Sequence, residues 1–69
     1  MEVFDPHNKA DVFFDGVHEV KIVGDSARIA LFSRQNGTGV IVARLVLPLS
    51  DLPDVIQALV IAQTQAARK

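Results

Sequence analysis

The eight residues from Val40 to Leu47 limit most strongly how this chain can fold, because Arg44 is the only polar side chain among them. A strand with one face in water alternates apolar and polar residues, and this run does not alternate. It therefore predicts a strand with both faces covered. What covers the second face is a real question in a chain of 69 residues.

A chain of this length forms one domain at most, and it buries only about 60% of the surface that its unfolded form exposes. Domains this small usually depend on disulfides, a metal or a partner subunit. The sequence has no cysteine, which excludes disulfides and thiolate metal sites. Its hydrophobic fraction of 49% is high for so small a domain and favours a subunit interface.

Three extended segments separated by turn residues are predicted within a single domain over residues 11–69, after a mostly irregular leader over residues 1–10. Asn36-Gly37 is a strong hairpin signal, because both central positions of a type I′ turn need positive φ. Gly16 indicates a bulge or a bend within the first segment. The predicted strands cover about residues 12–23, 27–33 and 40–47.

A helix is predicted over about residues 52–66. Pro48 closes the last strand because it cannot donate to a sheet ladder, and Ser50 or Asp51 suits the helix cap. We therefore expect an α+β fold, an antiparallel meander of three to four strands followed by one C-terminal helix packed on one sheet face. The apolar stripe of that helix consists of Leu52, Val55, Ile56, Leu59 and Ala66.

One helix covers only one face of a sheet. Each large apolar side chain left in water on the other face forgoes about 1.5–3 kcal/mol. A second copy of the chain is the predicted cover, most simply in a two-fold homodimer. The alternative is a leader that folds back as a lid through Val3 and Phe4. The residues expected at the oligomer interface are Val40, Val42, Val46, Val60 and Ile61.

No catalytic, cofactor or metal site is predicted, and we expect a protein that is not an enzyme. No serine lies in a nucleophile-elbow context, and two histidines without a cysteine make a nucleophilic triad improbable. A loose group of potential ligands lacks any recognised metal spacing. Its members are Asp5, His7, Asp11, Asp15 and His18.

Four basic residues form a strip if the strands align, namely Lys21, Arg28, Arg34 and Arg44. Such a strip is typical of a nucleic-acid surface, but the net charge of −1 and the lack of tyrosine and tryptophan argue against one. Arg44 needs a partner within its apolar strand. That partner is Glu19, Asp15 or an acid of a second subunit, unless the side chain reaches solvent past its neighbours.

The N-terminus carries acids and a proline where a signal peptide has a basic patch and an apolar run. No window reaches the roughly 18 apolar residues of a membrane span. With no cysteine to indicate an oxidising compartment, we expect a cytoplasmic protein without a membrane partner.

The two runs "VFFDGVHEVKIVGDSARIALFS" and "VIVARLVLPLSDLPDVIQAL" resemble a family of short bacterial proteins described as a domain of unknown function. The resemblance covers about residues 11–60, departs at the "DLP" entry to the helix, and implies no activity. It rests mainly on Phe14, Ala43, Arg44 and Pro48.

The order of strands and helix is more distantly similar to the core of the secretion chaperone SecB, and to single-strand nucleic-acid binders of the PUR and PC-type coactivator kind. These are likenesses of fold, which does not fix function. The sequence predicts a non-enzymatic homo-oligomeric interaction module that binds a protein segment, in the manner of a chaperone or by strand addition. The alternative is a single-stranded nucleic-acid-binding or regulatory protein that uses the basic strip.

Overall fold

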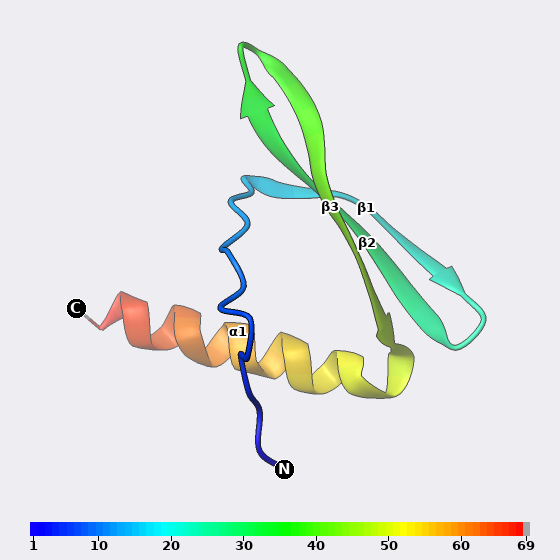
Figure 1. Cartoon of the computed structure of the whole chain (residues 1–69), viewed down its shortest axis with the longest axis vertical. Coiled ribbons are helices and arrows are strands. Elements are labelled where there is room, and N and C mark those ends of the chain that lie inside the picture. Colours follow the sequence, from blue (N-terminus) through cyan, green and yellow to red (C-terminus); the bar gives the residue numbers. More distant parts are fainter. Residues whose placement is uncertain (69) are drawn as a thin grey trace.

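The computed structural model describes residues 1–68, so Lys69, the last residue of the predicted domain, lies outside the described residues. Three antiparallel strands in the order β1-β2-β3 are followed by one helix, which confirms the predicted α+β class (Figure 1). The elements are β1 (Gly16–Val23), β2 (Ser26–Gln35), β3 (Thr38–Pro48), the short 3₁₀ helix η1 (Leu49–Asp51) and α1 (Leu52–Ala67).

Two tight turns join the strands. Gly24 has a φ of 58° in the first turn. In the second turn, Asn36 and Gly37 have φ values of 52° and 79°. Both values are positive, as the type I′ turn predicted for this pair requires. The local turn chemistry therefore sets the order of the strands and the register of the residues next to each turn.

The first strand is shorter than predicted. It begins at Gly16, and the residues before it form no strand, so the described part of the chain has a three-stranded sheet. The leader is organised only by a turn, in which the Asn8 amide donates to the Asp5 carbonyl at 3.2 Å and the Lys9 amide to the Asp5 carboxylate at 2.9 Å. Every side chain from Met1 to Asp15 is exposed, so the leader does not fold back as a lid.

Both outer strands carry a bulge at the same level of β2. Val17 and Ala43 lie opposite Leu31 on its two sides, and each outer strand then shows one extra residue, His18 in β1 and Val42 in β3. A bulge increases the local twist and bends its strand, and the sheet in Figure 1 is strongly twisted. The bulges also change which face of the sheet the residues on either side of them share.

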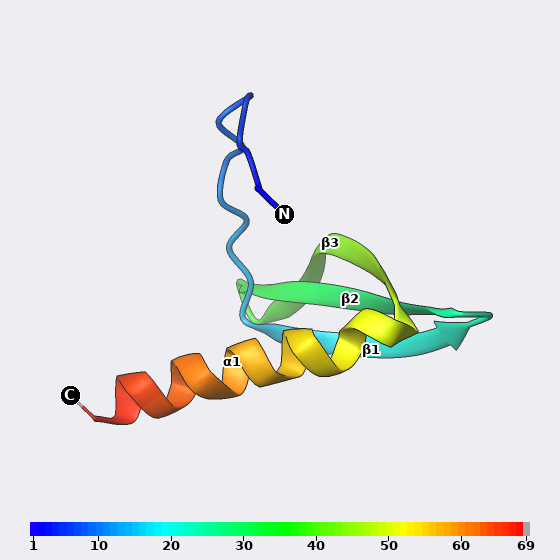
Figure 2. The same cartoon turned by 90° about the horizontal axis from the view of Figure 1, so that it is seen from below.

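The sequence predicted that the helix packs on one face of its own sheet. In the structure the helix does not lie across that sheet. The Leu49 amide donates to the Asp25 carbonyl at 2.8 Å, which fixes η1 against the turn between β1 and β2. From there α1 runs away from the strands (Figures 1 and 2). Only Leu52 of the helix is partly covered, and its side chains from Pro53 to Ala67 are exposed. Pro48 and Pro53 restrict the chain on either side of η1 and hold this exit direction.

Very little of the chain is buried. Among residues 1–68 only Ala27 at 0% and Leu31 at 5% exposure are buried, and both are apolar residues of the central strand. Neighbouring strands on both sides protect β2, while the faces of the sheet stay open. Within the same residues no helix is both long and apolar enough to cross a membrane.

Candidate interaction surfaces

The two faces of the sheet differ in chemistry, because Arg28 and Arg34 of β2 lie on one face and Ala27, Ile29 and Leu31 on the other. Directly opposed residues of neighbouring strands share a face, so the register assigns the outer strands as well. The apolar face includes Val17, Val20, Ile22, Ala27, Ile29, Leu31, Val40, Ala43, Leu45 and Leu47. The cationic face includes Glu19, Lys21, Val23, Arg28, Ala30, Phe32, Arg34, Ile41, Arg44 and Val46.

Large side chains of the apolar face lie open to solvent. Val20 is 54% exposed, Ile22 58% and Leu45 47%. The apolar stripe of α1 is also uncovered, since Val55, Ile56 and Leu59 are all exposed. Two complementary apolar surfaces of one chain are therefore both without a cover from the rest of that chain.

The bulge at Val42 separates residues that were expected to act together. Val40 lies opposite Ser33 and so shares the side of the apolar face, whereas Val46 lies opposite Arg28 on the cationic face. Strict alternation along β3 would have placed both on one face, and the extra residue reverses it. Val60 and Ile61 are exposed on α1, so the predicted interface residues do not form one surface within a chain.

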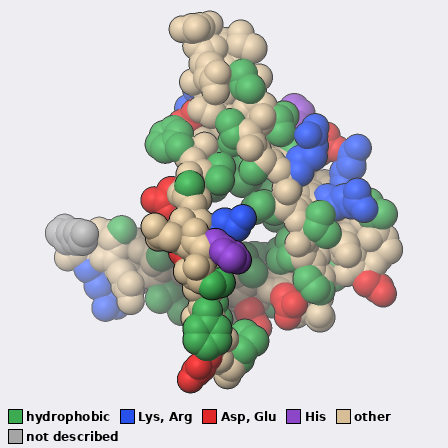
Figure 3. Space-filling model, viewed as in Figure 1, with side chains coloured by type: hydrophobic (Ala, Val, Ile, Leu, Met, Phe, Trp, Pro, Cys, Tyr) green, Lys and Arg blue, Asp and Glu red, His purple; other side chains and the backbone are tan. Residues whose placement is uncertain are grey.

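The four basic residues of the predicted strip all lie on the cationic face, and Lys21, Arg28 and Arg44 line one hollow there. Arg28 on β2 lies opposite Lys21 on β1 and opposite Val46 on β3. Arg44 on β3 lies opposite Ala30 on β2. Figure 3 shows Lys and Arg side chains gathered over the sheet. Arg34 lies further along β2, with its guanidinium carbon 5.8 Å from the centre of the Phe32 ring.

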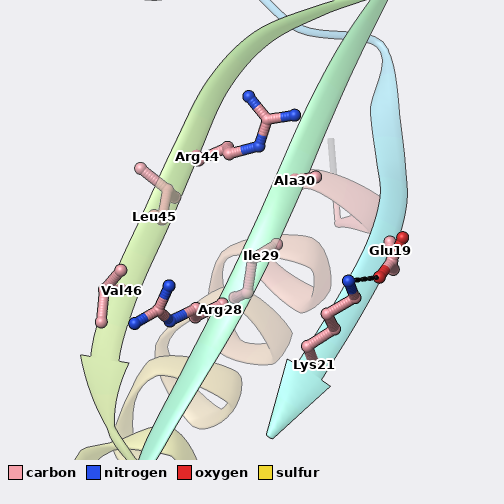
Figure 4. A pocket seen from close by; sticks show the side chains of 8 residues that line it. All are labelled: Glu19, Lys21, Arg28, Ile29, Ala30, Arg44, Leu45 and Val46. Carbon is pink, nitrogen blue, oxygen red and sulfur yellow. Dashed lines mark ion pairs between the residues drawn. The ribbon is translucent and has the colours of Figure 1, made fainter. Parts of the chain in front are cut away.

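A shallow hollow of about 210 Å³ lies between these side chains (Figure 4). Its floor is formed by the strands, and its only ion pair joins the Lys21 ammonium to the Glu19 carboxylate at 3.1 Å. Within residues 1–68 no carboxylate lies within 4.0 Å of an arginine guanidinium of this face. The arginine charges are therefore not neutralised by the part of the chain that the structure describes.

Arg44 does not form either of the intramolecular pairs expected for it. Ala30 on β2 separates it from Glu19 on β1. The Asp15 carboxylate instead accepts a hydrogen bond from the Arg34 amide at 2.6 Å. The side chain of Arg44 is exposed, which agrees with the alternative that it reaches solvent past its neighbours.

The potential metal ligands are not assembled into a site. Three or more His, Asp or Glu side chains do not gather anywhere within residues 1–68. His18 is the extra residue of the β1 bulge, and Asp15 is engaged at the end of the sheet.

The exposed residues Val20, Ile22 and Leu45 of the apolar face were not among the predicted interface residues. The alternation in β1 is visible in the sequence and marks Val20 and Ile22 as one face. No sequence signal marks the bulge at Val42, because neither glycine nor proline stands there.

Comparisons with protein-family models, with curated proteins and with solved structures gave no significant match.

Proposed function

We propose that this protein is a non-enzymatic homo-oligomeric interaction module whose fold is completed by a second copy of the chain. The observation that carries the proposal is the amount of surface left open by one chain. Its accessible surface is 6224 Å², whereas a folded monomer of 7.5 kDa is expected to expose about 4,200 Å².

The excess of about 2,000 Å² per chain corresponds to about 4,000 Å² for a pair, which lies within the range of obligate homodimers. The radius of gyration supports the same reading. It is 14.5 Å, compared with about 11 Å for a compact domain of this length. With only two buried side chains among residues 1–68, one chain does not resemble an independently stable monomer.

In this assembly α1 of the second copy covers the apolar face of the sheet. Sheet face and helix stripe match in chemistry, and the connection through η1 keeps them apart within one chain. Two chains related by a two-fold axis satisfy both surfaces at once, since each gives a helix and receives one. In this arrangement Leu45 of one copy lies beneath Leu59 or Ile56 of the other.

The assembled module then offers a sheet edge to a protein segment. β3 is the longest strand, with 11 residues, and it pairs with β2 on one side only within the described chain. An extended segment that adds to such an edge gains main-chain hydrogen bonds along its length. This supports segment binding by strand addition as the use of the assembly.

Sedimentation equilibrium at tens of micromolar tests the assembly. We expect a mass of twice the 7.5 kDa of one chain, or a higher multiple. A folded monomer at this concentration would overturn the proposal. Segment binding is tested separately with a library of extended apolar peptides, whose binding should not weaken with salt. A stable oligomer that binds none of these peptides would contradict the proposed segment binding but not the proposed assembly.

A further inference from the structure

We infer that the cationic face of the sheet is a binding site for single-stranded nucleic acid. This inference goes beyond the proposed assembly. It concerns the face opposite to the one that a second copy covers, so the two surfaces are available together.

The charges of the chain are separated in space. The net charge is −1, yet four of the seven Lys and Arg residues lie on this one face. The carboxylate of the face is Glu19, which is paired with Lys21. At the rim, Asp15 is engaged with the Arg34 amide. The remaining acids lie in the residues before β1, in the first turn, in η1 and in the first turn of α1. The three arginines therefore give a local positive surface on a weakly acidic protein.

The register places like charges against each other. Lys21 and Arg28 are direct cross-strand partners, and like charges at such positions lower the stability of a sheet, although the Lys21 ammonium points to Glu19 and the Arg28 guanidinium toward β3 (Figure 4). A local conflict of this kind is expected where a surface serves a ligand, and an anion bound at this face relieves it. The conflict thus points to an anionic ligand at this position.

The apolar residues next to the cations indicate which class of anionic ligand fits this face. Val46 lies opposite Arg28, Ala30 lies opposite Arg44, and the half-buried Phe32 lies beneath Arg34. Bases stack on aromatic rings and on guanidinium planes, whereas an acidic peptide needs only the charges. Arg28 and Arg34 are six residues apart on β2, which corresponds to roughly 20 Å of strand. This is an open track that an extended strand of nucleic acid can follow, with phosphates on the arginines and bases over the apolar residues.

Fluorescence anisotropy with a labelled oligothymidylate of about 12 nucleotides tests the inference, since such sites take about 4–16 nucleotides. We expect binding at 50 mM salt that weakens steeply by 200 mM, with a log–log slope of about −0.7 for each phosphate contact. The double variant Arg28→Gln with Arg44→Gln should weaken binding at least tenfold at 50 mM salt and flatten the slope by about 1.4. Phe32→Leu should weaken binding with little change in slope.

The matched control is Arg68→Gln, which removes one positive charge at the end of α1, away from the sheet, and should leave binding within twofold. Circular dichroism and sedimentation of each variant establish that fold and assembly are kept. No binding at 50 mM salt would overturn the inference, and so would binding that the double variant leaves unchanged. Equal binding of a duplex, or tighter binding of polyglutamate, would overturn the assignment to single strands. Each of these results is independent of the oligomeric state.

Discussion

Lys21 of β1 and Arg28 of β2 are direct partners in the register of the sheet, and both side chains are positively charged. Only Lys21 has an ion-pair partner in the described chain, the Glu19 carboxylate at 3.1 Å. Opposed like charges lower the stability of an antiparallel pair by a few tenths of a kcal/mol to about 1 kcal/mol. The pair therefore links the stability of the sheet to the chemistry of its cationic face.

Replacing Arg28 with threonine should raise the free energy of unfolding by about 0.2–1 kcal/mol, because threonine suits a strand and removes the repulsion. Urea unfolding at fixed protein concentration measures the change. Arg34→Thr is the matched control, since Arg34 lies opposite Gly39 and no like charge is relieved there. A less stable Arg28→Thr variant would show that the opposed charges do not strain the sheet.

The Asp15 carboxylate closes the end of the sheet by accepting from the Arg34 amide at 2.6 Å. Asp15→Ala should lower the free energy of unfolding by about 1 kcal/mol, because β1 begins at Gly16 and offers no other acceptor there. Asp15→Asn keeps an oxygen acceptor and should lose less. Equal losses in the two variants, measured by urea unfolding, would contradict the role of this hydrogen bond.

The turn between β2 and β3 depends on Gly37, whose φ is 79°. Gly37→Ala should destabilise the protein by about 1–2 kcal/mol, because a side chain is strained in the left-handed region. Gly39→Ala is the control, since a Cβ there would meet the Phe32 ring at an ordinary 3.6 Å. Thermal unfolding should show a loss at Gly37 only. A comparable loss at both positions would mean that the turn geometry is not the cause.

A substitution at Leu59 distinguishes the proposed assembly from a free monomer. Its side chain is 66% exposed in one chain, so Leu59→Asp should not destabilise a monomer appreciably. In the proposed assembly it lies on the partner's sheet, and an aspartate there should abolish association at tens of micromolar. Gln57→Asp adds the same charge to the polar side of α1 and should leave the mass in sedimentation unchanged. Similar behaviour of the two variants would show that the stripe is not the interface.

The elements that follow from local chemistry were predictable. Asn36-Gly37 sets a hairpin by its φ requirements alone, and Pro48 ends a strand because it lacks an amide hydrogen. Alternation along β2 also places Arg28 and Arg34 on one face. Once the first turn sets the register, Lys21 joins them, so this part of the basic strip could be anticipated from the sequence. Arg44 shares the face only because of the bulge at Val42.

The features that depend on contacts across the sheet or between chains were not predictable. Val42 becomes an extra residue only because Leu31 and Phe32 pair with Ala43 and Ile41, and the sequence of β3 has no glycine or proline to indicate this. The stripe on α1 indicates that the helix is to be covered, but it does not show which chain provides the cover. For this reason the expected packing of α1 on its own sheet was wrong, although the helix itself was predicted almost to the residue.

The central claim is that one chain does not hold this fold alone. Its most direct test is the midpoint of thermal unfolding measured over about 1 to 100 micromolar protein, because unfolding that is coupled to dissociation depends on concentration. We predict a single cooperative transition whose midpoint rises steadily with concentration. A cooperative transition with the same midpoint across this range, together with a monomer mass, would contradict the account.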